Sequence, residues 1–250
     1  YEQHYPDGAC TLGLCYESGM GVEEDKARAV ELYREAAEQD FPPAMCNLGF
    51  CYYQGIGVEE DEEKAAEWFT KAADREVPRA IFLLGECYDR GFGVEQNYER
   101  AVKLYQSAAD KEYTSAYCSL GLCYEWGQGV EKDLDKALEL YRLAADRGMP
   151  RAQCNLGFCY YQGIGVEEDN DEAVKWFTLA ADQGYPRAQQ MLGECYENGY
   201  GVEKDEGKAV ELYRQAHEAG YPSATCALGL CYELGTGVER SEERRVGKEC

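Results

Sequence analysis

The chain has 250 residues, of which 45% are hydrophobic, and its formal net charge at pH 7 is −23. This hydrophobic content is typical of a folded protein and excludes a disordered chain. No apolar run approaches the roughly 20 residues that a membrane-spanning helix needs, so we expect no membrane insertion. The 48 acidic residues against 25 basic ones repel phosphate backbones, which argues against nucleic acid as a partner.

A glycine in the frame Leu-Gly-x-Cys-Tyr returns every 36 residues along the chain, each time followed by Gly-x-Gly-Val. The seven copies are Gly13, Gly49, Gly85, Gly121, Gly157, Gly193 and Gly229. A fixed period of this length indicates a repeat protein, in which one supersecondary unit buries its apolar face against its neighbours. The sequence therefore predicts a solenoid.

The second repeat shows the pattern of its first helix, helix A. Ala44, Leu48 and Tyr52 recur at helical spacing and predict a helix over residues 43–54. Gly55 and Gly57 end this helix, because glycine readily adopts the left-handed conformation that often follows a helix.

A second helix, helix B, begins after Asp61, a residue type that caps helix N-termini. Within helix A, Gly49 costs about 1 kcal/mol relative to alanine, so something must offset it. We expect a close approach of helix B, with Ala72 and Ala73 supplying a flat surface. The predicted buried stripe of helix B is Ala65, Trp68, Phe69, Ala72 and Ala73.

The repeat predicts a single solenoid domain over residues 1–239. Six complete repeats, 7–42, 43–78, 79–114, 115–150, 151–186 and 187–222, are followed by a seventh helix A at 223–239. Residues 240–250 break the pattern and resemble a translated sequencing adapter, so we expect a non-native tail there.

The pattern resembles that of the Sel-one-like repeat (SLR) family, which is related to the tetratricopeptide repeats. The matching residues of the second repeat are Ala44, Leu48, Gly49, Tyr52, Gly55, Gly57, Val58, Asp61, Ala65, Trp68, Phe69, Ala72 and Ala73. The resemblance covers about residues 5–239 and implies an all-α fold, a right-handed α/α superhelix of 36-residue helix-turn-helix repeats. It also implies a protein–protein interaction scaffold or adaptor in signalling, assembly or host interaction.

If tetratricopeptide-like geometry holds, helix A lines a concave face. The helix A positions opposite the Ala44, Leu48 and Tyr52 stripe vary between repeats and carry aromatic, amide and acidic groups that suit a bound peptide. The predicted partner-binding residues are Asn47, Phe50, Tyr53, Gln54, Glu86, Trp126, Asn155, Phe158, Tyr161, Gln162 and Glu194. We expect a protein or peptide partner with basic and apolar residues. The alternative is that Phe50 and Phe158 only pack between neighbouring A helices.

Repeats 2 and 5 are identical over 46–61 and 154–169, whereas their B helices differ. Recent duplication alone would spread changes over both helices, so a functional constraint on helix A is one interpretation. Gene conversion or biased repair is the other.

The 13 cysteines of the chain lie mostly in two rows on helix A. Equivalent cysteines in adjacent repeats are about 10 Å apart, which is beyond disulfide reach. We therefore expect buried, reduced thiols and a cytoplasmic protein. The chain starts at Tyr1 without Met, so its true N-terminus, with any signal peptide, is expected to be missing. The alternative is a secreted or periplasmic repeat protein that contacts host protein or cell-wall carbohydrate.

The sequence offers no catalytic or metal-binding constellation. His4 and His217 are its two histidines, and no C-x-x-C pair is present. Two distant histidines leave no plausible Ser-His-Asp or Cys-His arrangement, and without a C-x-x-C pair zinc has no ligand set. We expect no enzymatic activity, no cofactor and no metal site.

Overall fold

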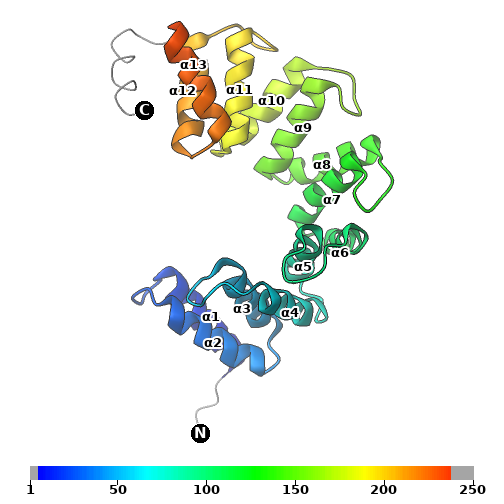
Figure 1. Cartoon of the computed structure of the whole chain (residues 1–250), viewed down its shortest axis with the longest axis vertical. Helices are drawn as coiled ribbons and strands as arrows, with labels where there is room; N and C mark the ends of the chain where they lie inside the picture. The colour runs from blue at the N-terminus through cyan, green and yellow to red at the C-terminus, as the bar shows by residue number, and fades with distance from the viewer. Residues whose placement is uncertain (1–4, 238–250) are drawn as a thin grey trace. The chain divides into compact units, whose positions relative to one another are not determined.

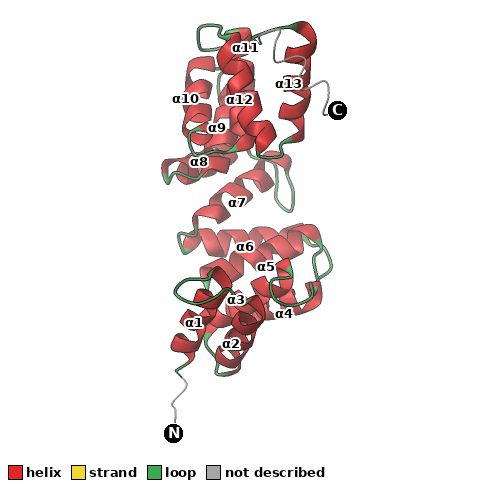
Figure 2. Ribbon diagram, turned by 90° about the vertical axis from the view of Figure 1, so that its left-hand side faces the viewer, coloured by secondary structure: helices red, strands yellow, loops and turns green. Residues whose placement is uncertain are grey.

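The computed structural model describes residues 5–237, which form 13 α-helices and no strand (Figures 1 and 2). In sequence order the helices are α1 (Pro6–Ser18), α2 (Lys26–Glu38), α3 (Pro42–Gln54), α4 (Glu62–Ala73), α5 (Pro78–Arg90), α6 (Tyr98–Asp110), α7 (Thr114–Trp126), α8 (Leu134–Asp146), α9 (Pro150–Gln162), α10 (Asn170–Ala181), α11 (Pro186–Asn198), α12 (Glu206–Glu218) and α13 (Pro222–Leu234). Odd-numbered helices are the predicted A helices and even-numbered helices the B helices. The predicted all-α solenoid of 36-residue repeats is confirmed, whereas its right-handed twist stays a prediction.

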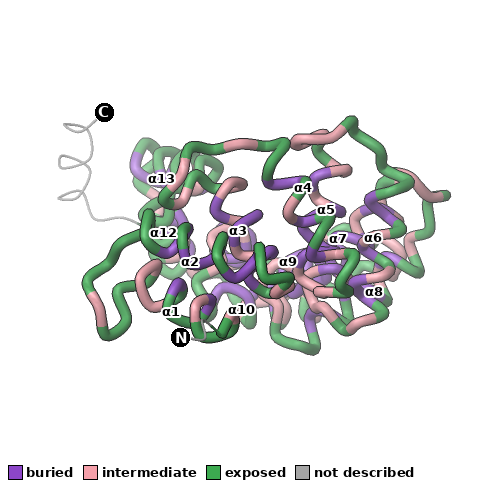
Figure 3. Tube along the Cα trace, turned by 90° about the horizontal axis from the view of Figure 1, so that it is seen from below, coloured by how far each residue is buried: buried purple, intermediate pink, exposed green. Residues whose placement is uncertain are grey.

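The protein divides into two compact units, with the boundary between Lys132 and Asp133 in the turn after α7. Unit 1 contains α1 to α7 and unit 2 contains α8 to α13. Within each unit every helix packs against the helix before it. Buried positions follow the helices, and the connecting turns are largely exposed (Figure 3). The predicted single domain over 1–239 stays a prediction, and the adapter-like tail at 240–250 lies outside the described residues.

The predicted residues end helix A and cap helix B at the turn between them. Gly55 follows α3 with φ 66°, and its backbone N–H donates to the Cys51 carbonyl. The Asp61 side chain accepts from the backbone N–H of Lys64 at the start of α4. The Asp61 backbone N–H donates to the Tyr52 carbonyl at 3.0 Å. One aspartate therefore caps helix B and ties it to the end of helix A.

An aromatic ring of helix B lies directly on the helical glycine of helix A. A Cβ atom on Gly49 would be 2.8 Å from the ring of Phe69. The same contact joins Gly13 to Tyr33, Gly85 to Tyr105, Gly157 to Phe177 and Gly193 to Tyr213. The expected close approach is confirmed, but the expected surface was wrong, because the ring and not the Ala72–Ala73 pair covers the glycine. Only a residue without a side chain leaves room for the ring.

The second glycine of each turn serves the contact between successive repeats. Gly93 has φ +65°, and a Cβ there would lie 2.0 Å from the carbonyl oxygen of Glu62, the first residue of α4 in the preceding repeat. Gly57, Gly201 and Gly237 make equivalent approaches to Lys26, Asn170 and Glu206. The sequence predicts only a role in helix termination for this glycine. Its backbone contact shows that it also sets how closely repeats stack.

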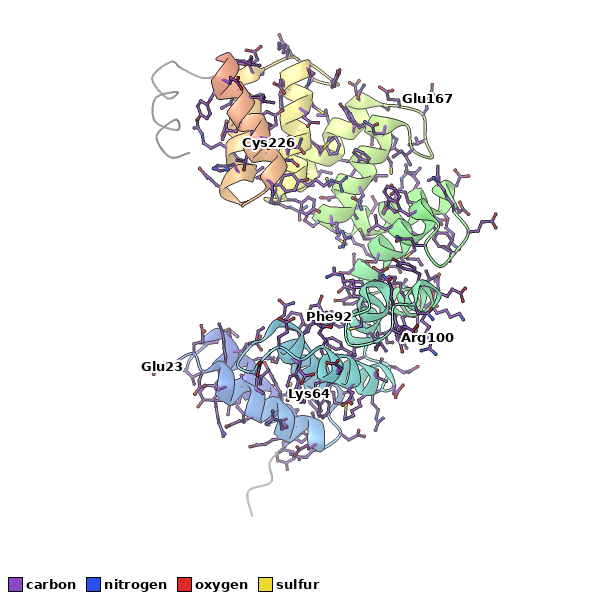
Figure 4. The ribbon with its side chains drawn as sticks, in the orientation of Figure 1. Glu23, Lys64, Phe92, Arg100, Glu167 and Cys226 are labelled. Atoms are coloured by element: carbon purple, nitrogen blue, oxygen red, sulfur yellow. The ribbon has the colours of Figure 1, made fainter. Side chains whose placement is uncertain are left out.

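The cysteines within the described residues form no disulfide, and most are buried. Ten are buried, Cys15 is half-buried and Cys226 is exposed on α13 (Figure 4). Cys10, the equivalent of Cys226 in the first repeat, contacts Asn47 of the following A helix. No helix follows α13 within residues 5–237, which leaves Cys226 uncovered. The predicted burial is thus confirmed at ten positions and wrong at Cys226.

Thiol titration at pH 8 is expected to separate Cys226 from the buried thiols. Burial raises the pKa of Cys46 to about 11 and that of Cys87 to about 12, so these groups stay protonated and unreactive at pH 8. In a Cys250→Ser background the native protein should show a fast phase that Cys226→Ser removes. Denaturation without reductant should then expose the remaining thiols. A shortfall after denaturation would mean that disulfides are present.

Candidate functional site

In unit 1, three side chains from two A helices form a cluster. Arg79, the second residue of α5, donates from Nη1 to Oδ1 of Asn47 on α3 at 3.3 Å. Its guanidinium carbon lies 4.7 Å from the centroid of the Phe50 ring. The Asn47 amide also donates to Sγ of Cys10 on α1 at 3.6 Å. These contacts join one side of α3 to α1 and to α5. We call the half-buried residues of α3 and α5 on this side the helix A face of unit 1.

Unit 2 contains the same cluster. Arg187, the second residue of α11, donates from Nη1 to Oδ1 of Asn155 on α9 at 3.1 Å. Its guanidinium carbon lies 5.3 Å from the centroid of the Phe158 ring. Phe158 is half-buried, whereas Asn155 is buried. This surface of α9 and α11 is the helix A face of unit 2.

Tyr53 and Tyr161 belong both to this face and to the core. Their rings contact the buried rings of Phe69 and Phe177, with centroids 6.2 Å and 6.3 Å apart. In repeats 1 and 6 the ring of helix B is a tyrosine, and the same helix A position holds a glutamate that accepts a hydrogen bond from the tyrosine hydroxyl. The pairs are Tyr33 with Glu17 at 2.6 Å and Tyr213 with Glu197 at 2.9 Å. Where phenylalanine removes the hydroxyl, the acceptor is replaced by tyrosine.

Tyr53 is further held by the next repeat of unit 1. Its ring contacts the ring of Phe92 edge-on, with the ring centroids 4.6 Å apart. Phe92 lies in the turn after α5 (Figure 4). Arg90 donates from Nη1 to the Tyr53 hydroxyl at 3.2 Å. The Phe50 and Tyr53 rings stack with centroids 6.2 Å apart. The aromatic side chains of α3 are therefore fixed in orientation, which suits a binding surface.

Two acidic residues lie on the same faces but in different environments. Glu86 on α5 pairs with Arg90 one turn later, at 3.7 Å. Glu194, at the equivalent position of α11, accepts from the Gln190 amide. Burial raises the pKa of Glu194 above the usual range for glutamate. One turn after Glu194 the residue is Asn198, which carries no charge.

The other predicted site residues lie at helix ends. Gln54 and Gln162 are exposed last residues of α3 and α9. Trp126, which is 68% exposed, ends α7 in unit 1. The structure thus brings together Asn47, Phe50 and Tyr53, and likewise their counterparts on α9, with the two glutamines at the edge.

Three arginines of the site, Arg79, Arg90 and Arg187, are not among the residues predicted from the sequence. A signal for two of them was available, because Pro-Arg-Ala begins three A helices, at 78–80, 150–152 and 186–188. Within the described residues, no helix is long and apolar enough to cross a membrane. Nor do residues 5–237 contain a group of three or more His, Cys, Asp or Glu side chains that could hold a metal ion.

Stacked helix pairs with glycine turns and ring-on-glycine contacts define an α-helical repeat protein. The Sel1 repeat matches this chain seven times, at residues 6–41, 42–77, 78–113, 114–149, 150–185, 186–221 and 222–244. The chain belongs to the Sel1 repeat family, as the sequence resemblance predicted. Proteins of this family generally act as protein-interaction scaffolds, and their fold is typically non-catalytic.

Solved structures of the same family are similar to this chain. A Sel1 repeat protein from Oxalobacter formigenes is 36% identical with a TM-score of 0.80, over 86% of this chain and 88% of that one. The protective antigen c5321 of uropathogenic Escherichia coli, which has an SLR fold, is 34% identical with a TM-score of 0.75. That match covers 97% of this chain and 52% of c5321, so this chain spans about half its length.

More distant structures share the fold. The immunity protein Pa5087 from Pseudomonas aeruginosa is 23% identical with a TM-score of 0.59, over 85% of this chain and 81% of that one. The comparison with curated proteins gives no match.

Proposed function

We propose that this protein is a scaffold or adaptor that binds a peptide or protein segment along its helix A face. The supporting observation is that the same Asn, Phe and Arg cluster occurs in both units. Packing of the fold does not require it, because the positions of Asn47 and Phe50 hold Thr11 and Leu14 in the first repeat. Half-buried aromatic rings beside amides are typical of peptide-binding surfaces.

The proposed partner segment carries basic and apolar residues. Apolar side chains would pack on Phe50 and Phe158, and Gln54 and Gln162 would add hydrogen bonds at the edge. Glu194 and the net charge of −23 favour a cationic segment and speed its encounter with the protein. We propose no nucleic-acid partner, no membrane insertion, no cofactor and no catalytic activity.

A cytoplasmic location is proposed with this function, because buried cysteines without disulfides among the described residues suit a reducing compartment. The second candidate is a secreted or periplasmic protein that contacts host protein or cell-wall carbohydrate. The similarity to the protective antigen c5321 favours this candidate. The upstream coding sequence separates the two, because a signal peptide there would support export and its absence the cytoplasm.

Peptide selection tests the binding face without a known partner. Random dodecapeptides are selected on the whole protein, and the tightest binder is titrated against the Phe50→Ala, Phe158→Ala double variant. We expect binding about tenfold or more weaker, as for buried aromatic anchors. The loss should persist from about 0.1 M to about 1 M salt, because aromatic burial is not screened.

The matched control truncates exposed leucines of B helices. Leu143 on α8 and Leu179 on α10 are 41% and 48% exposed. The Leu143→Ala, Leu179→Ala variant should bind the peptide as the unchanged protein does. Loss of binding in this control, with full binding in the phenylalanine variant, would place the site on the B helices and refute the proposal.

A further inference from the structure

Arg79 and Arg187 are held in place without a carboxylate partner. Several other cations of the protein pair with acids, as Lys64 does with Asp61 and Arg75 with Asp40. Arg187 instead contacts the Asn155 carbonyl and the Phe158 ring, and within the described residues it makes no ion pair. Arg79 has the same kind of environment. The 48 acidic residues of the sequence thus leave two oriented guanidinium groups unpaired on the proposed binding face.

Each of these guanidinium groups retains hydrogen-bonding capacity. A guanidinium has five N–H donors in a planar fork, and Arg187 uses one of them, on Nη1, toward Asn155. The fork matches the two oxygens of a carboxylate. Because the ring and the amide already restrict the side chain, little further conformational entropy is lost when a carboxylate binds.

An acidic group marks the other end of the unit 2 face. Glu194 follows Arg187 by seven residues on α11, which places it on the same side of the helix and about 10 Å further along the axis. The half-buried rings of Phe158 and Tyr161 on α9 pack against the core cluster that includes Met191 and Leu192 of this stretch. Burial, together with the charge of Glu194, raises the pKa of the Tyr161 hydroxyl. The face therefore has a cationic end, an aromatic middle and an anionic end.

We propose that the unit 2 face binds an extended segment that carries a carboxylate and a cation about 10 Å apart, with an apolar side chain between them. The carboxylate binds Arg187, the apolar side chain packs on Phe158, and the cation lies against Glu194. In a polyproline II segment, residues i and i+3 share one side and lie about 9 Å apart, which fits the spacing along α11. Residue i+1 is turned by about 120°, so it faces the neighbouring helix, α9, which carries Phe158. The inference rests on the proposed peptide-binding function and specifies its ligand.

The unit 1 face differs at its anionic end. Arg79 retains the same free donors as Arg187, but Arg90 already pairs with Glu86. Unit 1 is therefore expected to bind the carboxylate without a preference for a cation. The residue four positions after the glutamate, Arg90 in unit 1 and Asn198 in unit 2, distinguishes the two faces.

The test uses defined peptides and the whole ¹⁵N-labelled protein. Acetyl-Glu-Leu-Pro-Lys-amide is titrated against the neutral acetyl-Gln-Leu-Pro-Gln-amide, with dissociation constants taken from amide shifts of α9 and α11. We expect the charged peptide to bind about tenfold tighter. Arg187→Gln should abolish the preference for Glu, and Glu194→Gln the preference for Lys. Arg187→Lys, which keeps the charge but loses the fork, should retain only part of the preference.

A second pair of peptides identifies the source of the carboxylate. Acetyl-Lys-Pro-Leu is compared as its free acid and as its amide. Tighter binding of the free acid supports capture of a terminal carboxylate, and tighter binding of the Glu peptide supports capture of an acidic side chain. Equal binding of charged and neutral members in both pairs would overturn the inference.

The outcomes separate this inference from the proposed function. Shifts confined to α9 and α11 with equal affinities would leave the peptide-binding face intact and refute the charge pattern alone. Shifts confined to α10 and α12 would refute both. Thermal melts of Arg187→Gln and Glu194→Gln must match that of the unchanged protein, so that lost binding reports lost contacts and not unfolding.

Discussion

Replacing Gly201 by alanine is expected to destabilise unit 2 by about 2 to 5 kcal/mol. The residue has φ +64°, and its new Cβ would lie 2.2 Å from the Asn170 carbonyl oxygen. Left-handed backbone costs a residue with a Cβ about 1 to 2 kcal/mol, and overpacking against a backbone atom that cannot rotate away adds about 1 to 3 kcal/mol. Urea unfolding followed by circular dichroism measures the loss.

Gly184 supplies the matched control for Gly201. It has φ +76°, but a Cβ there would meet nothing within 4 Å. Gly184→Ala should therefore show only the conformational cost of about 1 to 2 kcal/mol. Equal losses in the two variants would show that the contact with the preceding repeat contributes nothing to stability.

Replacing the helical glycine of helix A by alanine is expected to change the stability of the protein in opposite directions in two repeats. A Cβ on Gly193 would lie 2.5 Å from the Tyr213 ring, so Gly193→Ala should destabilise the protein by about 1 to 3 kcal/mol. A Cβ on Gly229 would meet nothing within 4 Å, because no B helix covers α13 among the described residues. Gly229→Ala should stabilise by up to about 1 kcal/mol, since alanine favours the helix.

The same unfolding experiment checks both of these variants. If Gly193→Ala is as stable as Gly229→Ala, the ring of Tyr213 moves aside at no cost. In that case the repeated helical glycine needs another explanation than close packing.

The helices and their ends could be predicted because they depend on local spacing. Ala44, Leu48 and Tyr52 lie on one helix face whatever the rest of the protein does, and Asp61 caps the residues beside it. The covering of Gly49 depends on Phe69, 20 residues later, and on the angle between two helices. Periodicity within one helix contains no information about that angle, so the wrong residues were chosen.

Only part of the site could be predicted, because spacing within one helix does not show contacts between repeats. Asn47, Phe50 and Tyr53 could be placed on the exposed side of one helix, but Arg79 reaches them from the next repeat. Its contact depends on the offset between repeats, which the backbone approach of Gly93 to Glu62 helps to set. The dual role of Tyr53 was also missed, because its core contact to Phe69 follows from the three-dimensional packing.

Hydrogen exchange of the whole protein, with and without the selected dodecapeptide, tests the binding face most directly. We expect slower exchange in the A helices that carry the clusters, α3 and α5 in unit 1 and α9 and α11 in unit 2. Exchange in α4, α6, α10 and α12 should be unchanged. Protection confined to those B helices would contradict a partner-binding helix A face.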